Sequence, residues 1–405
     1  MNAVLTIVGG FYRERCRFPQ ADEMWGSGGR AAAAIADLGV ETSLLTAADA
    51  KAERQLLSIA HVFRFRTAVE RIPETLTFHY DHPLSAPVIW PLAHHLSKVA
   101  IRAEAPCILQ FGMLDAAVSP SADTLVYDPQ EPFSPQPVSI LTKPSRLAYV
   151  LNSTEARRLG ADDDVTKAAA GIAVRLGAHV VVVKQGARGA LVWDAGKAEQ
   201  VPAYETRTVW PIGSGDVFAA VFAACWAVHG RSSVEAADSA SRAAAFYVQS
   251  RVLPVPREVI YGNEEMSPLR LLHHAALEGE YDVYLAGPFF NMAQLWLVEE
   301  ARLSLLGMGL KVFSPYHDVG PGDGMVVAPK DVEALKRSRA VLALIDGVDA
   351  GTIFEVGYAR AIGKPVVAFV QSTPDEPLKM ICGTGCEIVD DFVTAIYRTA
   401  WASWK

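Results

Sequence analysis

Short β-branched runs alternate with alanine-rich stretches along nearly the whole chain. Such alternation is typical of α/β folds, in which helices connect the strands of a parallel sheet and cover it. Several of the runs are apolar at every position, as expected for strands that are covered on both faces. We predict strands at residues 5–8, 108–111, 124–127, 148–151, 179–183, 283–286, 340–345 and 365–370. Helical spacing of apolar residues predicts helices at 30–38, 217–228 and 234–248.

The alternation breaks once, between about residues 252 and 280. Pro254 and Pro256 interrupt the pattern there, and a new strand pattern begins at Val283. A chain of 405 residues is also too long for one ordinary hydrophobic core. We therefore predict two doubly wound, mainly parallel-sheet α/β domains at residues 1–254 and 281–405, joined by a linker at residues 255–280.

Composition narrows the classes of partner. The chain has 45 acidic and 37 basic residues and a net charge of −8, without the basic cluster that nucleic acids require. No apolar run approaches the ~20 residues that span a bilayer. The start of the chain lacks the basic segment of a signal peptide, and five scattered cysteines show no zinc-site spacing. We expect a cytoplasmic protein that binds small molecules, no nucleic acid and no membrane.

Acidic residues and a tyrosine recur around the predicted strands of the second half. Tyr284 lies in a strand that runs into a Gly-Pro-Phe-Phe loop, and Asp331 lies in a predicted helix. Asp346 and Asp349 follow the next strand, and Glu355 lies where the following helix begins. In a parallel sheet, the carboxyl ends of strands and the N-termini of the following helices converge on one crevice. We therefore expect these side chains to share a site.

Each acid also has an ordinary structural explanation. Thr352 and Glu355 fit a capping box, and Asp331 fits the first turn of a helix, where the dipole favours an acid. Several acids gathered at one crevice would, however, repel one another in a purely structural arrangement. Such clusters are where carboxylate pKa values are tuned for chemistry. We favour a catalytic cluster.

About 120 residues of this half resemble the nucleoside 2-deoxyribosyltransferase family, which includes related N-glycoside hydrolases. The resemblance rests on Tyr-Leu-Ala-Gly-Pro-Phe from Tyr284, on Asp331 with its helix, and on the Asp-Gly-x-Asp…Glu-x-Gly-Tyr-Ala core from Asp346. It implies a flavodoxin- or Rossmann-like fold without a cofactor. Glu355 would attack the anomeric carbon to form a glycosyl-enzyme ester, oriented by Tyr284. Asp349 and Asp331 would contact the base and its departing nitrogen, one of them as proton donor.

The family divides by acceptor, because a second base gives transfer and water gives hydrolysis. The apolar, bulky loop at residues 287–290 favours an unphosphorylated sugar. An alternative keeps the Glu355 chemistry on a dinucleotide such as NAD, in a glycohydrolase role. Family members complete their site with a neighbouring subunit, which implies a homo-oligomer. The substrate-binding residues expected here are Gly287, Pro288, Phe289 and Asp346.

A second set of motifs lies in the first 250 residues, and its most informative member is Gly213-Ser214-Gly215-Asp216 ahead of a helical run. Three small residues before a helix let backbone N–H groups surround a transferring phosphoryl group. An aspartate at the edge can take a hydroxyl proton. A glycine-rich turn with Asp216 as a helix cap explains the same residues equally well.

The whole set resembles the ribokinase-like (PfkB family) sugar and nucleoside kinases. The resemblance implies a ribokinase-like fold, ATP and Mg²⁺ as cofactors, Asp216 as catalytic base, and residues 213–215 as the anion hole. Asn152 and Glu155 would belong to the magnesium and phosphate network, with Glu155 acting on the metal indirectly. The nucleotide would lie beside Lys184, Gly186 and Gly189.

Three positions and one segment depart from that family's pattern. Trp210-Pro211 stands in place of Asp-Thr before the anion hole, and Arg30 stands in place of the asparagine expected after Gly28-Gly29. The region around Glu14, flanked by Arg13 and Arg15, replaces the sugar-binding aspartate, and the lid segment at residues 63–83 is short. Arginines that line such a pocket would favour an anionic ligand. The acceptor contacts expected here are Gly28, Gly29, Arg30 and Glu14.

Together the two sets predict a bifunctional enzyme of nucleoside or nucleotide metabolism. One domain would cleave or transfer at the N-glycosidic bond of a (deoxy)nucleoside. The other would phosphorylate a sugar or a nucleoside with ATP. The alternative for the first half is a ligand-binding regulatory module that keeps the fold without turnover.

Overall fold

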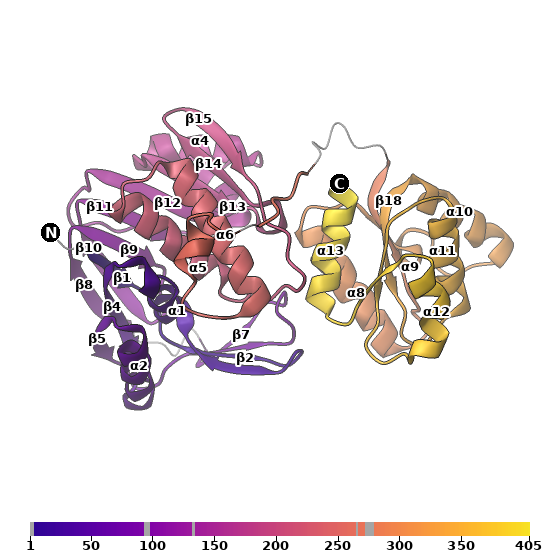
Figure 1. Cartoon of the computed structure of the whole chain (residues 1–405), viewed down its shortest axis with the longest axis horizontal. Coiled ribbons are helices and arrows are strands. Elements are labelled where there is room, and N and C mark those ends of the chain that lie inside the picture. The colour runs from indigo at the N-terminus through magenta and orange to yellow at the C-terminus, as the bar shows by residue number, and fades with distance from the viewer. Residues whose placement is uncertain (1–3, 93–97, 132–133, 265, 272–278) are drawn as a thin grey trace. The chain divides into compact units, whose positions relative to one another are not determined.

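The computed structural model describes residues 4–92, 98–131, 134–264, 266–271 and 279–405 (Figure 1). The chain divides into two compact units. Unit 1 comprises Met1–Thr206 and Trp210–Leu269, and unit 2 comprises Arg207–Val209 and Arg270–Lys405. No helix in the described ranges is long and apolar enough to cross a membrane.

A nine-stranded sheet, in the order β15-β14-β13-β12-β11-β9-β1-β4-β5, forms the centre of unit 1. Its strands from β13 to β5 are parallel, and β14 and β15 are antiparallel additions at one edge. The strands are β1 (Val4–Val8), β4 (Glu41–Ala48), β5 (Arg66–Arg71), β9 (Cys107–Phe111), β11 (Thr124–Asp128), β12 (Arg146–Asn152), β13 (Val180–Lys184), β14 (Ala190–Asp194) and β15 (Lys197–Val201).

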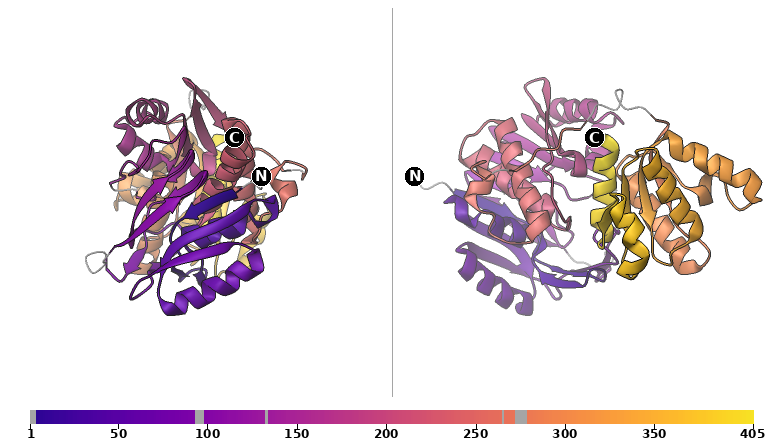
Figure 2. Two further views of the ribbon diagram at one scale, coloured as in Figure 1. Left: turned by 90° about the vertical axis from the view of Figure 1, so that its left-hand side faces the viewer. Right: turned by 45° about the vertical axis from the view of Figure 1, so that its right-hand side comes forward.

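Helices cover both faces of this sheet (Figure 2). One face packs against α1, α2, α5, α6 and α7, whose alanines and aromatic residues form one apolar core with the sheet. The other face packs against α3 and α4. The helices are α1 (Gly26–Ala34), α2 (Ala50–Phe63), α3 (Ser153–Gly160), α4 (Val165–Leu176), α5 (Ser214–Ala223), α6 (Ser233–Ser250) and α7 (Arg257–Ile260).

Two smaller sheets complete unit 1. The lid sheet has the order β3-β2-β6-β7, and a two-stranded sheet pairs β8 with β10. The predicted lid segment at residues 63–83 supplies β5 to the main sheet and β6 to the lid sheet. The strands are β2 (Arg13–Cys16), β3 (Ala21–Met24), β6 (Thr77–Tyr80), β7 (Val88–Trp90), β8 (Val99–Glu104) and β10 (Ala116–Ser121).

Unit 2 is a five-stranded parallel sheet in the order β17-β16-β18-β19-β20. The order 2-1-3-4-5 is that of flavodoxin-like folds, whose ligands bind at the carboxyl ends of the strands beside the first one. The strands are β16 (Tyr281–Ala286), β17 (Val312–Phe313), β18 (Ser338–Leu344), β19 (Val366–Phe369) and β20 (Glu387–Val389).

The helices of unit 2 cover both faces of its sheet (Figure 1). α10, α11 and α12 share one apolar core with the sheet, and α8 packs with α13. A doubly wound α/β fold is therefore confirmed for this unit. The helices are α8 (Met292–Gly307), α9 (Pro315–Asp318), α10 (Gly324–Arg337), α11 (Ala350–Ala361), α12 (Asp375–Gly383) and α13 (Phe392–Trp404).

All eight predicted strands are observed, as β1, β9, β11, β12, β13, β16, β18 and β19. The helix expected at 30–38 instead begins at Gly26, and 36–38 form a separate 3₁₀ turn. The early part of this helix packs closely on the first strand's turn, because a Cβ on Gly28 would lie 2.7 Å from the carbonyl oxygen of Gly9. Glycine is a poor helix former, but here it permits backbone-to-backbone contact.

Part of the predicted linker is folded onto unit 1. Val255, Val259 and Ile260 are buried in its core, and the N–H of Leu269 donates to the carbonyl of Ala203 at 2.8 Å. Residues 265 and 272–278 of the linker lie outside the described residues. The boundaries at 254 and 281 remain predictions.

Candidate functional sites

The first candidate site lies at the carboxyl edge of the sheet of unit 2, between β16 and α11. The hydroxyl of Tyr284 donates to Oε1 of Glu355 at 2.5 Å. Tyr284 is fully buried, and its ring stacks on Phe313 with centroids 5.5 Å apart. Two residues that are 71 positions apart in sequence are thus brought together, as the strand-end argument predicts.

The surroundings of Glu355 disfavour its charged form. Burial raises the pKa of Glu355 to about 7, the hydrogen bond from Tyr284 opposes that rise, and the charges of Asp331 and Asp349 add to it. Burial also raises the pKa of Asp331. Oδ1 of Asp331 is buried and has no hydrogen-bond partner among the described residues. These acids therefore form one electrostatic cluster, and Asp331 keeps unused hydrogen-bonding capacity.

Two structural explanations from the sequence are wrong in detail. Helix α10 begins at Gly324, so Asp331 lies in its middle and not in its first turn. Helix α11 is capped by Asp349, whose Oδ2 accepts from the N–H of Thr352 at 2.8 Å and from its hydroxyl at 3.0 Å. Thr352 is therefore not the cap, and the carboxylate of Glu355 is free of the expected capping box.

Asp346 has a different environment from the other acids. Its carboxylate accepts from the N–H groups of Gln371, Ser372 and Thr373 and from the hydroxyl of Thr373, each at 2.9 Å. Burial would raise the pKa of Asp346, but these hydrogen bonds outweigh it and the pKa is lowered. The geometry favours a structural role, in which Asp346 ties the loop after β18 to the loop after β19.

The loop after β16 carries the expected substrate contacts Gly287, Pro288 and Phe289. A Cβ on Gly287 would meet Leu344 at 3.0 Å, and the ring of Phe289 lies 5.3 Å from those of Phe290 and Tyr316. The sequence analysis missed Tyr316, which belongs to no motif. It also missed Gln294, whose Oε1 accepts from the N–H of Phe290 at 3.0 Å.

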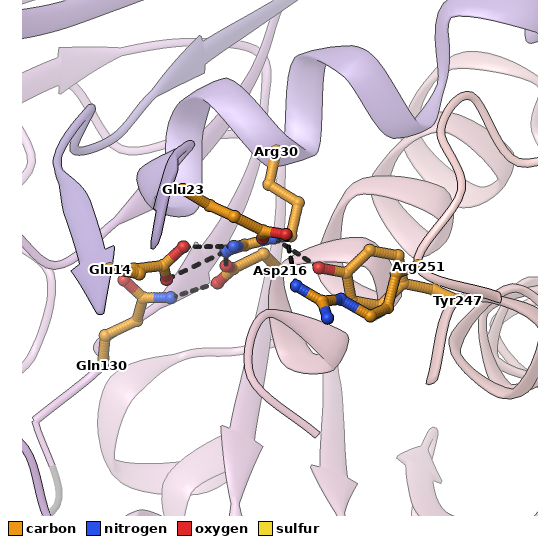
Figure 3. A network of polar contacts seen from close by, with 7 residues as sticks. All are labelled: Glu14, Glu23, Arg30, Gln130, Asp216, Tyr247 and Arg251. Carbon is orange, nitrogen blue, oxygen red and sulfur yellow. Dashed lines mark hydrogen bonds and ion pairs between the residues drawn. The ribbon is translucent and has the colours of Figure 1, made fainter. Parts of the chain in front are cut away.

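The second candidate site lies in unit 1 and centres on Asp216 of α5 (Figure 3). Oδ2 of Asp216 accepts from Nη1 of Arg30 at 2.8 Å, and Oδ1 accepts from Nε2 of Gln130 at 2.7 Å. The guanidinium of Arg30 also donates to both carboxylate oxygens of Glu14, and its Nε donates to the hydroxyl of Tyr247 at 3.0 Å. We call Glu14, Arg30, Gln130, Asp216 and Tyr247 the Arg30 network.

The charged members of the Arg30 network are hidden from solvent. Arg30 is 0% exposed, and Glu14 and Asp216 are each 6% exposed. Burial raises the pKa of Glu14, and the charge of Arg30 opposes that rise. Burial would lower the pKa of Arg30, but the nearby carboxylates outweigh it and the pKa is raised. The fold thus brings Arg30 and Glu14 together with Asp216, as the sequence predicts. Their side chains, however, bind one another, whereas the sequence analysis expected them to contact an acceptor.

The predicted anion hole lies directly against this network. Gly213 has φ +82° and caps α5, so Asp216 is the third helical residue and the explanation of Asp216 as a cap is wrong. A Cβ on Gly213 would lie 2.2 Å from Nε of Arg30. The N–H of Ser214 donates to the carbonyl of Pro211 at 3.0 Å, which forms a turn. Glycine at 213 is therefore required by both conformation and contact.

The predicted nucleotide side contains a second charged pair. Nζ of Lys184, at the end of β13, forms an ion pair with the buried Asp128, and a Cβ on Gly215 would lie 3.4 Å from that Nζ. Burial raises the pKa of Asp128 to about 7, although Lys184 opposes the rise. The sequence analysis missed Asp128. Its position at the end of a predicted strand was an available signal.

The other predicted nucleotide-side residues have evident structural roles. Oδ1 of Asn152 accepts from the N–H of Glu155 at 2.9 Å, and Oε2 of Glu155 accepts from the N–H of Asn152 at 2.8 Å. This is a capping box at the start of α3. Gly186 and Gly189 have positive φ, and a Cβ on Gly189 would lie 2.1 Å from the carbonyl oxygen of Val201.

Glycines 28 and 29 pack α1 against the first strand's turn. Besides the contact of Gly28, a Cβ on Gly29 would meet Phe11 at 2.8 Å.

Across the described ranges, no group of three or more His, Cys, Asp or Glu residues could hold a metal ion. The indirect action on magnesium predicted for Glu155 stays a prediction.

Family comparisons match the two halves separately. Residues 114–253 match the pfkB family carbohydrate kinase model, and residues 283–388 match the nucleoside 2-deoxyribosyltransferase model. A search of the curated proteins finds no match.

Solved structures similar to this chain include three kinases. A ribokinase from Thermotoga maritima is 16% identical, covering 65% of this chain and 100% of that chain, with a TM-score of 0.45. A nucleoside kinase from Methanocaldococcus jannaschii is 14% identical (65% and 99% covered, TM-score 0.48). A phosphofructokinase-2 mutant from Escherichia coli is 15% identical (65% and 99% covered, TM-score 0.43). The chain thus contains one region that matches the pfkB family carbohydrate kinase model and, after it, a second region that matches the nucleoside 2-deoxyribosyltransferase model.

Proposed function

We propose that the second domain cleaves or transfers the N-glycosidic bond of a nucleoside or deoxynucleoside, with Glu355 as nucleophile. The observation that supports this most is the 2.5 Å hydrogen bond from Tyr284 to Oε1 of Glu355. It orients the carboxylate and leaves the second oxygen to attack. An ester bond forms between that oxygen and the anomeric carbon while the C–N bond breaks and its electron pair goes to the base. Water or a second base then displaces Glu355.

The proton for the departing base comes, in this proposal, from Asp331. Its pKa is raised by burial, and its Oδ1 has no partner within the described part of the chain. Asp349 instead accepts two hydrogen bonds as the cap of α11. A carboxyl group that is to donate a proton must be protonated at working pH, which a raised pKa favours. Asp349 would then act through its charge on Glu355 and through the position of α11.

The substrate class follows from the loop after β16. Phe289, Phe290 and Tyr316 form an aromatic cluster, which suits a flat base or an unphosphorylated sugar better than a phosphate. Transfer, hydrolysis and cleavage of a dinucleotide such as NAD share the same Glu355 chemistry. The acceptor and the leaving group therefore have to be identified by product analysis.

The test is a panel of nucleosides, deoxynucleosides, their monophosphates and NAD, with and without an acceptor base, followed by chromatography of the free base. Glu355→Ala is compared with Glu376→Ala, an exposed acid of α12 that pairs with Lys379. Base release or exchange that is lost only in Glu355→Ala supports the proposal. Release of nicotinamide alone selects the glycohydrolase alternative. Activity that survives in Glu355→Ala would refute the role of Glu355.

For the first domain we make two proposals, and both are compatible with the kinase family match. One is phosphorylation of a sugar or nucleoside by ATP and Mg²⁺, with Asp216 as base. The other is a regulatory module that binds a ligand without turnover. The pairing of both oxygens of Asp216 with Arg30 and Gln130 favours the second. ADP release on a panel of pentoses and nucleosides discriminates between them, because a regulatory module forms none.

Under the first of these proposals the two activities would be consecutive. The second domain would release a pentose or modified pentose, and the first domain would phosphorylate it or its parent nucleoside. A cytoplasmic location and a homo-oligomeric state remain predictions.

A further inference from the structure

We infer that Arg30 is a specificity-determining residue of the first domain, whose guanidinium fills the phosphoryl-acceptor position and closes it to neutral sugars. The inference rests on the proposed placement of Asp216 at the phosphoryl-acceptor position, and it argues against phosphorylation of a neutral sugar by the wild type. It concerns what can bind beside Asp216, which can be measured separately from phosphoryl transfer. The Arg30 network is shown in Figure 3.

First, the guanidinium of Arg30 occupies the space that an acceptor hydroxyl would need. An acceptor hydroxyl has to lie within about 3 Å of the base and also face the phosphoryl group in the anion hole. Nη1 of Arg30 is 2.8 Å from Oδ2 of Asp216. Nε of the same side chain lies 2.2 Å from where a Cβ on Gly213 would be. One guanidinium therefore spans the gap between the base and the first residue of the anion hole.

The second step is hydrogen bonding. Both oxygens of Asp216 already accept hydrogen bonds, one from Arg30 and one from Gln130. Both oxygens of Glu14 accept from Arg30. A neutral sugar would have to displace the guanidinium and replace its charge with hydroxyl donors. Breaking a buried ion pair while its partners stay buried is strongly unfavourable.

The third step is charge, which argues against the anionic ligand expected from the sequence. Arg30 is balanced by two carboxylates, Glu14 and Asp216, so these three groups carry a net charge of −1. An anion that approached them would meet a negative cluster and not a free arginine. The other two arginines of this region, Arg13 and Arg15, both donate to the carboxylate of Asp22. The arginines of this region therefore form ion pairs with acidic side chains of the protein itself.

The departures from the kinase family's pattern are coupled through these contacts. Arg30 pairs with Glu14, and both stand at positions where that family has other residues. Trp210, a third departure, lies under the guanidinium of Arg251 at 4.0 Å, and Arg251 pairs with Glu23. Arg30 and Glu14 therefore balance each other's charge, as a closed acceptor pocket requires, whereas Trp210 packs against Arg251 and its Nε1 has no hydrogen-bond partner among the described residues.

The test uses the full chain and titrates D-ribose by calorimetry, with and without MgATP. We expect no measurable binding to the wild type at millimolar ribose and at least tenfold tighter binding to Arg30→Asn. The matched control is Arg66→Gln, an exposed arginine of β5 that pairs with Glu41. Wild-type binding as tight as that of Arg30→Asn would overturn the inference, as would a folded Arg30→Asn that gains no affinity.

Arg30→Asn leaves two buried carboxylates without a cation, so its folding is checked by melting temperature. A second variant, Glu14→Gln with Arg30→Gln, removes the pair together and should gain ribose affinity in the same direction. If this folded variant binds ribose no better than the wild type, the inference fails. ADP release is measured in parallel. Ribose binding without ADP release would support the role of Arg30 and reject phosphoryl transfer by Asp216.

Discussion

Glu355, in the second turn of α11, and Asp216, in the first turn of α5, are both acids on helices of an α/β fold, yet their partners differ. Glu355 receives a hydrogen bond from the neutral hydroxyl of Tyr284 and has other acids nearby, and burial raises its pKa to about 7. Asp216 receives a hydrogen bond from a buried guanidinium and another from an amide. Position in the fold brings an acid to a site, and its partners decide whether it stays reactive.

The largest effect is expected for loss of the nucleophile. Glu355→Ala should lower base release by at least about 10³-fold, because the variant lacks the carboxylate proposed to form the glycosyl ester. Asp216→Ala should leave base release unchanged, and chromatography of the free base measures both. A similar loss of base release in Glu355→Ala and Asp216→Ala would contradict the prediction that only Glu355 is needed for this reaction.

A smaller loss of activity is expected for the proton donor. Asp331→Asn should lower the rate of base release by about 10²-fold, the usual contribution of a general acid. Asp349→Asn keeps a good N-cap and should cost less. Rates on natural bases and on a base with a better leaving group measure the effect, because the better leaving group needs less protonation. The reverse order of the two variants would make Asp349 the donor.

Opposite effects on stability should separate the two acids. The pKa of Glu355 is raised from 4.5 to about 7, so its contribution to stability is fully present below about pH 4.5 and lost as pH rises through 7. Glu355→Gln should therefore be more stable than wild type at pH 8, by about 3 kcal/mol, and nearly equal to it near pH 4.5. Asp216→Asn should be less stable at pH 8, because Arg30 loses a buried partner. Denaturant titration at both pH values tests the signs.

The smallest effect concerns the hydrogen bond to the nucleophile. The rate of base release should rise with pH through about 7, because Glu355 must be ionised to attack. The bond from Tyr284 lowers the pKa of Glu355, so Tyr284→Phe should move this rise to higher pH and reduce activity at pH 7 by about tenfold. An unshifted pH profile with reduced activity would mean that Tyr284 acts by orientation alone.

Strand-end reasoning worked for some acids and failed for others with the same pattern. Asp346 and Asp349 both follow β18, but Asp346 is used by backbone N–H groups at residues 371–373. Those donors lie in a loop some 25 residues further along the chain, and the local sequence around Asp346 does not predict them. Tyr284 and Glu355 were predictable together because both belong to motifs whose order and spacing place them at one sheet edge.

The sequence by itself determined the strands, the doubly wound architecture and the set of candidate residues, because burial on both faces of a strand is written in its local run of apolar side chains. Only the tertiary structure decided what each charged candidate does. Arg30 meets Glu14, 16 residues earlier, and Asp216, 186 residues later. In a buried site of low dielectric, the nearest partner governs whether a charge is balanced or reactive. That partner is set by how distant segments pack.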